Sequence, residues 1–196
     1  MPNWCYTTYK IFGPKEDRDK LYNAIEELKN LPEPRVKNGF GNLWLGCLVD
    51  YFGGDWNTIY CRGDIVDYDN EDEYLRICTE TAWAEMCETR HFLEYVFPNL
   101  TFYYISEEEG MCEYYTNDKD GSIFHTKYYL DTSDFDDIDK EDFLTIEAAA
   151  KYIKENLPDL EFEPTIDSIN QAFNDLMEQD GNEDKYIALH EYVYEE

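Results

Sequence analysis

The sequence predicts an α+β fold followed by an acidic helical extension, on three observations. Over residues 1–130, β-branched and aromatic segments of strand length alternate with two segments of helical periodicity. Turn residues separate several successive strands, which is typical of antiparallel sheets. After residue 130 the chain becomes strongly acidic, and its apolar residues recur at helical spacing. We therefore divide it into an α+β domain at 1–130 and an acidic helical extension at 131–196, packed on or beside that domain.

The first strand and helix follow from the N-terminal pattern. Residues 5–12 are β-branched and aromatic, and Gly13-Pro14 ends this strand. Proline suits the first turn of a helix, and the acidic residues that follow it are favoured there by the helix dipole. Apolar residues then recur at helical spacing, which predicts a helix that ends near Asn30.

Further strands and a second helix complete the predicted domain. The expected strands are 43–52, 58–65, 74–83, 100–105, 111–116 and 123–130, and the helix is 85–97. The turn signal at 117–121 predicts that the last two strands form a hairpin. Strand, helix and strands occur twice in this order, with both helices expected on one face of the sheet. That order is the ferredoxin-like pattern.

Helix signals dominate the acidic extension. Thr145 can cap one helix that Pro158 stops, and Thr165 can cap another that ends near Gly181. The apolar spacing at 186–193 predicts a short last helix.

The charge of the chain excludes some partners and favours others. Its 196 residues include 45 acidic and 16 basic ones, for a net charge of -29, and 18 Tyr. Residues 99–196 carry 27 of the acids and 6 of the bases. Such a surface repels phosphate backbones and anionic membranes, so we expect neither direct nucleic-acid binding nor membrane binding. It attracts cations and basic protein surfaces.

The N-terminus and the cysteines indicate a cytoplasmic protein. The first residues have neither the basic nor the apolar region of a secretory signal, and no stretch has the length and apolarity of a membrane span. The six cysteines lie mostly in apolar stretches, where a free thiol packs as a small hydrophobe. Their even number is also compatible with disulfides. No cysteine or histidine spacing typical of zinc occurs, so we expect no metal and no cofactor.

Several short motifs resemble one protein family. The opening Met1-Pro2-Asn3-Trp4-Cys5 and the later Thr81-Ala82-Trp83 resemble the YubB-type ferredoxin-like family of phage and plasmid proteins. Looser matches are Gly54-Asp55-Trp56-Asn57 and the stretch of Leu100-Thr101-Phe102 with Glu109-Gly110. The resemblance covers about residues 1–130. It implies a ferredoxin-like fold and a mobile-element origin, and it supplies no catalytic residues.

Other chemistry is weakly indicated. Cys87 and His91 are spaced to meet on a helix, but a third orienting group is missing from the pattern, so we do not expect an enzyme. The turn at 117–121 lacks the first and last acids of a calcium loop. The four tryptophans could stack on a base or sugar, although packing in the core is the simpler account. A divalent-cation or small-ligand binding module and an uncharacterised enzyme therefore stay as alternatives.

The acidic run after residue 130 carries the main functional hypothesis. Acids at alternate positions of an extended segment lie about 6.6–7 Å apart on one face, and several such rows can imitate a phosphate array. We expect a non-enzymatic inhibitor or DNA mimic of a phage or mobile element. It would bind the basic nucleic-acid site of a host defence or DNA-handling protein. The expected partner-binding residues are Glu107, Glu108, Glu109, Asp131, Asp134, Asp136, Asp137, Asp139, Glu141 and Asp142.

Overall fold

The computed structural model describes residues 3–135, 137–180 and 185–195. The chain forms two compact units, Met1–Asn117 and Asp118–Glu196. The boundary drawn from the sequence, after residue 130, lies within the second of these units. No helix in the described part of the chain combines the length and the hydropathy of a membrane span.

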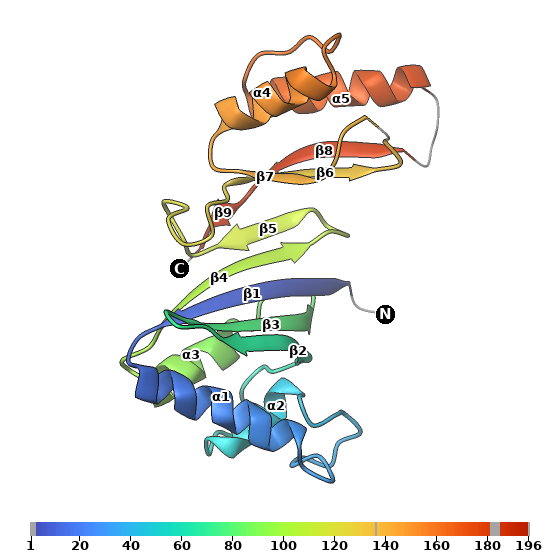
Figure 1. Ribbon diagram of the computed structural model, residues 1–196. Coiled ribbons are helices and arrows are strands. Elements are labelled where there is room, and N and C mark those ends of the chain that lie inside the picture. The colour runs from blue at the N-terminus through green and yellow to red at the C-terminus, as the bar shows by residue number, and fades with distance from the viewer. Residues whose placement is uncertain (1–2, 136, 181–184, 196) are drawn as a thin grey trace. The chain divides into compact units, whose positions relative to one another are not determined.

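The first unit is an antiparallel sheet with three helices on one face (Figure 1). Its strands lie side by side in the order β2-β3-β1-β4-β5, and each neighbouring pair is antiparallel. The elements are β1 (Trp4–Phe12), α1 (Lys15–Lys29), α2 (Leu45–Tyr51), β2 (Gly63–Asn70), β3 (Leu75–Ala82), α3 (Cys87–Val96), β4 (Thr101–Glu108) and β5 (Glu113–Thr116). Apolar side chains of all three helices and of the central strands form one core.

The second unit has its own sheet, β7-β6-β8, with two helices packed on one face (Figure 1). Its elements are β6 (Tyr128–Ser133), β7 (Glu141–Phe143), α4 (Ile146–Asn156), α5 (Ile166–Asp180), β8 (Tyr186–Glu191) and β9 (Val193–Tyr194). A separate core joins the sheet to the helices, with Leu130, Ile153 and Phe173 fully buried in it. The Thr145 hydroxyl accepts a hydrogen bond from the Ala148 N–H at 3.2 Å, which confirms the predicted cap of α4.

The broad α+β class is confirmed, but the predicted ferredoxin-like arrangement with two helices is wrong. The first unit contains a third helix, α2, and its sheet continues through β5. The expected helical extension is also wrong, because the second unit is built on a three-stranded sheet. The helix predicted at 186–193 is replaced there by the strand β8.

Local sequence patterns explain why α2 and β8 differ from the prediction, and long-range pairing explains the missing hairpin. Every residue from Leu45 to Val49 is buried, so this run shows neither alternation nor helical periodicity, and a buried helix cannot be told from a buried strand. In β8, Ile187 and Leu189 are buried while their neighbours are half-buried, which is the period of a strand. The predicted hairpin of 111–116 with 123–130 does not form, because β5 pairs with β4 and β6 pairs with β7 and β8.

Candidate functional site

The acids predicted to bind a partner are divided between the two units. Glu107 and Glu108 are the last residues of β4 in the first unit, and Glu109 directly follows them. The others, apart from Asp136, lie in the second unit, on β6, on β7 and in the loop that joins these strands. Asp136 lies outside the described residues. The predicted set is therefore not one continuous row along the chain.

Two of these acids are buried and hold their own unit together. The Glu108 carboxylate accepts hydrogen bonds from the backbone N–H groups of Gly110 (3.0 Å) and Met111 (2.8 Å), and so it caps the turn after β4. Asp131 is buried on β6 and forms an ion pair with Lys140 at 2.7 Å. These two carboxylates have structural partners, so they are poor candidates for contact with another protein.

The remaining acids of the second unit are exposed. Asp134, Asp137 and Asp139 lie in the loop between β6 and β7. Glu141 and Asp142 are exposed on β7, at the edge of the sheet. Desolvation and the repulsion of Glu141 raise the pKa of Asp142. These residues can meet a partner without a change in the fold.

A hollow in the second unit brings one of them together with acids that the sequence analysis missed. Its volume is about 510 Å³, within the range of ligand pockets. It lies between the end of α4, the loop that follows, and the second half of α5. Apolar residues line part of it: Leu157, Pro158, Leu160, Ala172 and Leu176. The carboxylates that line it are those of Asp137, Asp159, Glu161 and Asp175, and all four residues are exposed.

The lysines of the second unit only partly offset these charges. Residues 118–196 contain 23 acids and six bases, all of them lysines. Lys154 forms an ion pair with Glu161 at 3.3 Å at the rim of the hollow. Among the described residues, Asp137 and Asp159 form no ion pair, so their charges face solvent. An acidic rim beside apolar side chains suits a cation on an apolar stem, as in arginine or lysine.

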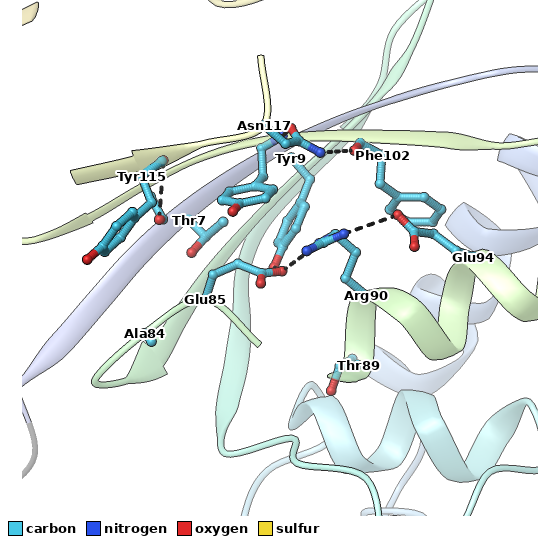
Figure 2. Close-up of polar contacts among 12 residues, drawn as sticks. Thr7, Tyr9, Ala84, Glu85, Thr89, Arg90, Glu94, Phe102, Tyr115 and Asn117 are labelled. Atoms are coloured by element: carbon cyan, nitrogen blue, oxygen red, sulfur yellow. Dashed lines mark hydrogen bonds and ion pairs between the residues drawn. The ribbon is translucent and has the colours of Figure 1, made fainter. Parts of the chain in front are cut away.

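A second cluster, which the sequence analysis also missed, lies inside the first unit. Figure 2 shows the Arg90 guanidinium between the carboxylates of Glu85 and Glu94. Arg90 Nε lies 3.1 Å from Glu85, and Arg90 Nη1 lies 3.4 Å from Glu94. The Tyr9 hydroxyl donates to Glu85 at 2.7 Å, and the guanidinium lies 5.0 Å from the centre of the Tyr104 ring.

This buried cluster fits a structural role better than a catalytic one. Burial raises the pKa of Glu85, although Arg90 and Tyr9 oppose the shift. Burial and the nearby Glu85 carboxylate also raise the pKa of Tyr9 well above its ordinary value. The adjoining cavity, of about 30 Å³, has room for about one water molecule and none for an organic substrate. The cluster thus ties α3 to β1 and β4.

The Cys87 and His91 pair has no support as a nucleophilic site. Both residues are exposed on α3. Desolvation and the Glu85 charge raise the pKa of the Cys87 thiol, which lowers the fraction of reactive thiolate. No group of three His, Cys, Asp or Glu side chains suited to a metal ion occurs among residues 3–135, 137–180 and 185–195. The calcium-like turn instead holds Asp118, which accepts hydrogen bonds from three backbone N–H groups.

The thiols give a direct check on the first unit. All six cysteines are free; Cys5, Cys47 and Cys61 are buried, and Cys87 and Cys112 are exposed. Burial raises the pKa of Cys61 to about 11. We expect iodoacetamide at pH 8 to label Cys112 and Cys87 in the native chain and to spare the three buried thiols. Peptide mass spectrometry reads the labelling, with the urea-unfolded chain as the control. Rapid labelling of Cys61 in the native chain would contradict its buried position in the first unit.

Comparisons with family models, with curated proteins and with solved structures find no match for this chain.

Proposed function

We propose that this chain is a non-enzymatic interaction protein whose second unit binds a basic segment of another protein. The observation that carries the proposal is the hollow between α4 and α5, where Asp137, Asp159 and Asp175 surround apolar side chains. The hollow is larger than one side chain needs, so it suits a short segment with several Arg or Lys residues. Carboxylates on the rim would contact the charged heads, while Leu157, Leu160 and Leu176 would contact the apolar stems.

The net charge supports the same proposal at longer range. A chain at -29 attracts basic surfaces and increases the rate at which they meet it. Strongly basic protein surfaces are typical of proteins that bind nucleic acid. The proposed partner is therefore a nucleic-acid-binding protein, and the chain would inhibit it by competing with phosphate groups for the same side chains. A host defence or DNA-handling protein fits this chemistry.

Binding of a model peptide tests the proposal. The probe is a fluorescent peptide of arginines and leucines, titrated with the full chain and followed by anisotropy. The variant D137N/D159N/D175N removes three charges from the hollow. Each exposed ion pair contributes about 0.2–1 kcal/mol, so we expect the triple variant to bind about tenfold more weakly at low salt.

A matched variant separates the hollow from the general charge of the chain. The substitutions E147Q, E163Q and D167N neutralise three exposed acids of the same unit that do not line the hollow. Both variants change the net charge by the same amount. We expect the control to lose less than about threefold in affinity, because its charges act only through the screened long-range field. Equal losses in the two variants would show that the hollow is not the binding site.

A further inference from the structure

The first unit contains a second hollow, lined by aromatic side chains, that neither the acidic surface nor the buried cluster explains. Its volume is about 610 Å³. It is bounded by residues 38–44, by residues 56–62 and by Glu88 at the start of α3. The aromatic residues that line it are Phe40, Trp44, Trp56 and Tyr60.

The aromatic rings are arranged for stacking. Phe40 lies nearly parallel to Trp44, with ring centres 5.3 Å apart and an interplanar angle of 18°. Trp56 meets Trp44 edge-on at 5.5 Å. Phe40 itself is 51% exposed, and Tyr60 is 48% exposed. A core would bury such rings, so this group presents apolar, planar surface to solvent.

Trp44 provides a separate indication of a ligand. The residue is only 5% exposed, and its Nε1–H has no hydrogen-bond partner within the described residues. The Cε3, Cζ3 and Cη2 edge of the indole lies against Gly46, and the Nε1 atom is itself buried. A buried donor without an acceptor costs about 1–3 kcal/mol, and a bound acceptor would recover that energy.

Two asparagine side chains beside the rings can form further hydrogen bonds with a ligand, one as a donor and one as an acceptor. Asn38 Oδ1 accepts the Phe40 N–H, and Asn57 Nδ2 donates to Asp55, which leaves Asn38 Nδ2 as a donor and Asn57 Oδ1 as an acceptor. Arg62 is exposed at the rim, and Glu88 already accepts the Tyr60 N–H at 2.7 Å. Among the described residues, one cation and one anion line the hollow, so it favours a ligand without net charge.

The backbone on both sides of Phe40 has few steric restraints. It lies between Gly39, with a φ of +93°, and Gly41, and a Cβ at either glycine would meet nothing within 4 Å. Glycines on both sides allow the backbone to turn the ring without steric cost. Movement of Phe40 would expose the face of Trp44 to a second planar ring.

We propose that this hollow binds an uncharged planar heteroaromatic ring of the nucleobase type, stacked on Phe40 and Trp44, with an acceptor on its edge taking the Trp44 Nε1–H. The site lies wholly in the first unit and does not depend on the function proposed for the second. A phosphorylated ligand is disfavoured because the whole chain is strongly negative.

Saturation-transfer NMR with adenosine, guanosine, cytidine and uridine tests this site on the full chain. We expect transfer to the base protons of at least one nucleoside at millimolar concentration, and none to ribose alone. The F40A variant should bind about tenfold more weakly, because one stacked base contact is lost. Y95A is the matched control, since Tyr95 is 84% exposed on α3 and does not line the hollow.

Trp44→Phe gives an independent readout, because it keeps a ring and removes the donor. We expect W44F to weaken nucleoside binding while the variant keeps the near-ultraviolet dichroism expected for a folded chain with one tryptophan fewer. The absence of transfer to every nucleoside would overturn the proposal. Equal binding by wild type, F40A and W44F would overturn it as well.

Discussion

Replacing Arg90 with Met is expected to lower the free energy of unfolding of the first unit by about 3–5 kcal/mol. The side chains of Arg90 and Glu85 are only 5% and 8% exposed and form an ion pair, so removal of the cation leaves a carboxylate without its main charge partner. The Met side chain keeps much of the apolar stem of Arg, so no large cavity forms. The decrease in the free energy of unfolding therefore comes mainly from the lost charge. Urea unfolding followed by tryptophan fluorescence measures it.

The double variant E85Q/R90M is the control for this prediction. It removes both charges, so it should recover a large part of the stability that R90M loses. A double variant no more stable than R90M would show that packing of the arginine stem, and not the buried pair, stabilises α3 on the sheet.

The R90M loss should also depend on pH in a defined direction. Burial already raises the pKa of Glu85, and Arg90 opposes that shift. Without Arg90, the folded chain would hold the Glu85 proton to a higher pH than the unfolded chain does. Stability then falls as pH rises through this window, because the folded state binds more protons. We therefore expect the R90M loss to be largest near pH 7 and to shrink as the pH approaches 5.

Asp118→Ala is expected to destabilise the second unit by about 3 kcal/mol. The Asp118 carboxylate is 4% exposed and accepts hydrogen bonds from the backbone N–H groups of Ser122, Ile123 and Phe124, at 3.1, 2.7 and 2.9 Å. Loss of this acceptor leaves several donors unpaired at once, each at a cost of about 1–3 kcal/mol that is not additive. Hydrogen exchange of the amides at 122–124 measures the local effect.

Asp118→Asn separates the hydrogen bonds from the charge. Asparagine keeps one acceptor oxygen at the same place, so it should retain part of the protection that D118A loses. Unchanged exchange at 122–124 in D118A would contradict the role assigned to this carboxylate.

Local sequence patterns predict much of the secondary structure. The strand pairing could not be predicted, because it joins segments that are far apart in the sequence. The β-branched and aromatic run at residues 5–12 predicts β1, and the Thr145 cap predicts α4, because these signals lie within one element. The fully apolar run at Leu45–Val49 has no period, so the sequence predicts a strand where α2 forms. The partners of β6 lie at 141–143 and 186–191, and nothing in the local sequence indicates that pairing.

The candidate sites also depend on residues that are distant in the sequence and come together only in the fold. The sequence shows the acidic run at 131–142, but among the described residues of that run only Asp137 lines the hollow. Its other acids come from the segment after α4 and from α5, which the fold brings together. Asp131 and Glu108 were misjudged because the sequence does not show burial. The sequence indicates Trp44 and Trp56 as stacking residues, but the aromatic hollow also needs residues 38–44 and 56–62 side by side, which only the fold shows.

Hydrogen exchange of the full chain with and without the arginine and leucine peptide tests the central claim most directly. We expect the peptide to slow exchange at residues 156–161 and 172–179, which border the acidic hollow, and to leave the first unit unchanged. The effect should disappear in D137N/D159N/D175N. Slower exchange confined to the first unit, or no change at these residues while the peptide is bound, would contradict the claim that the second unit binds basic segments.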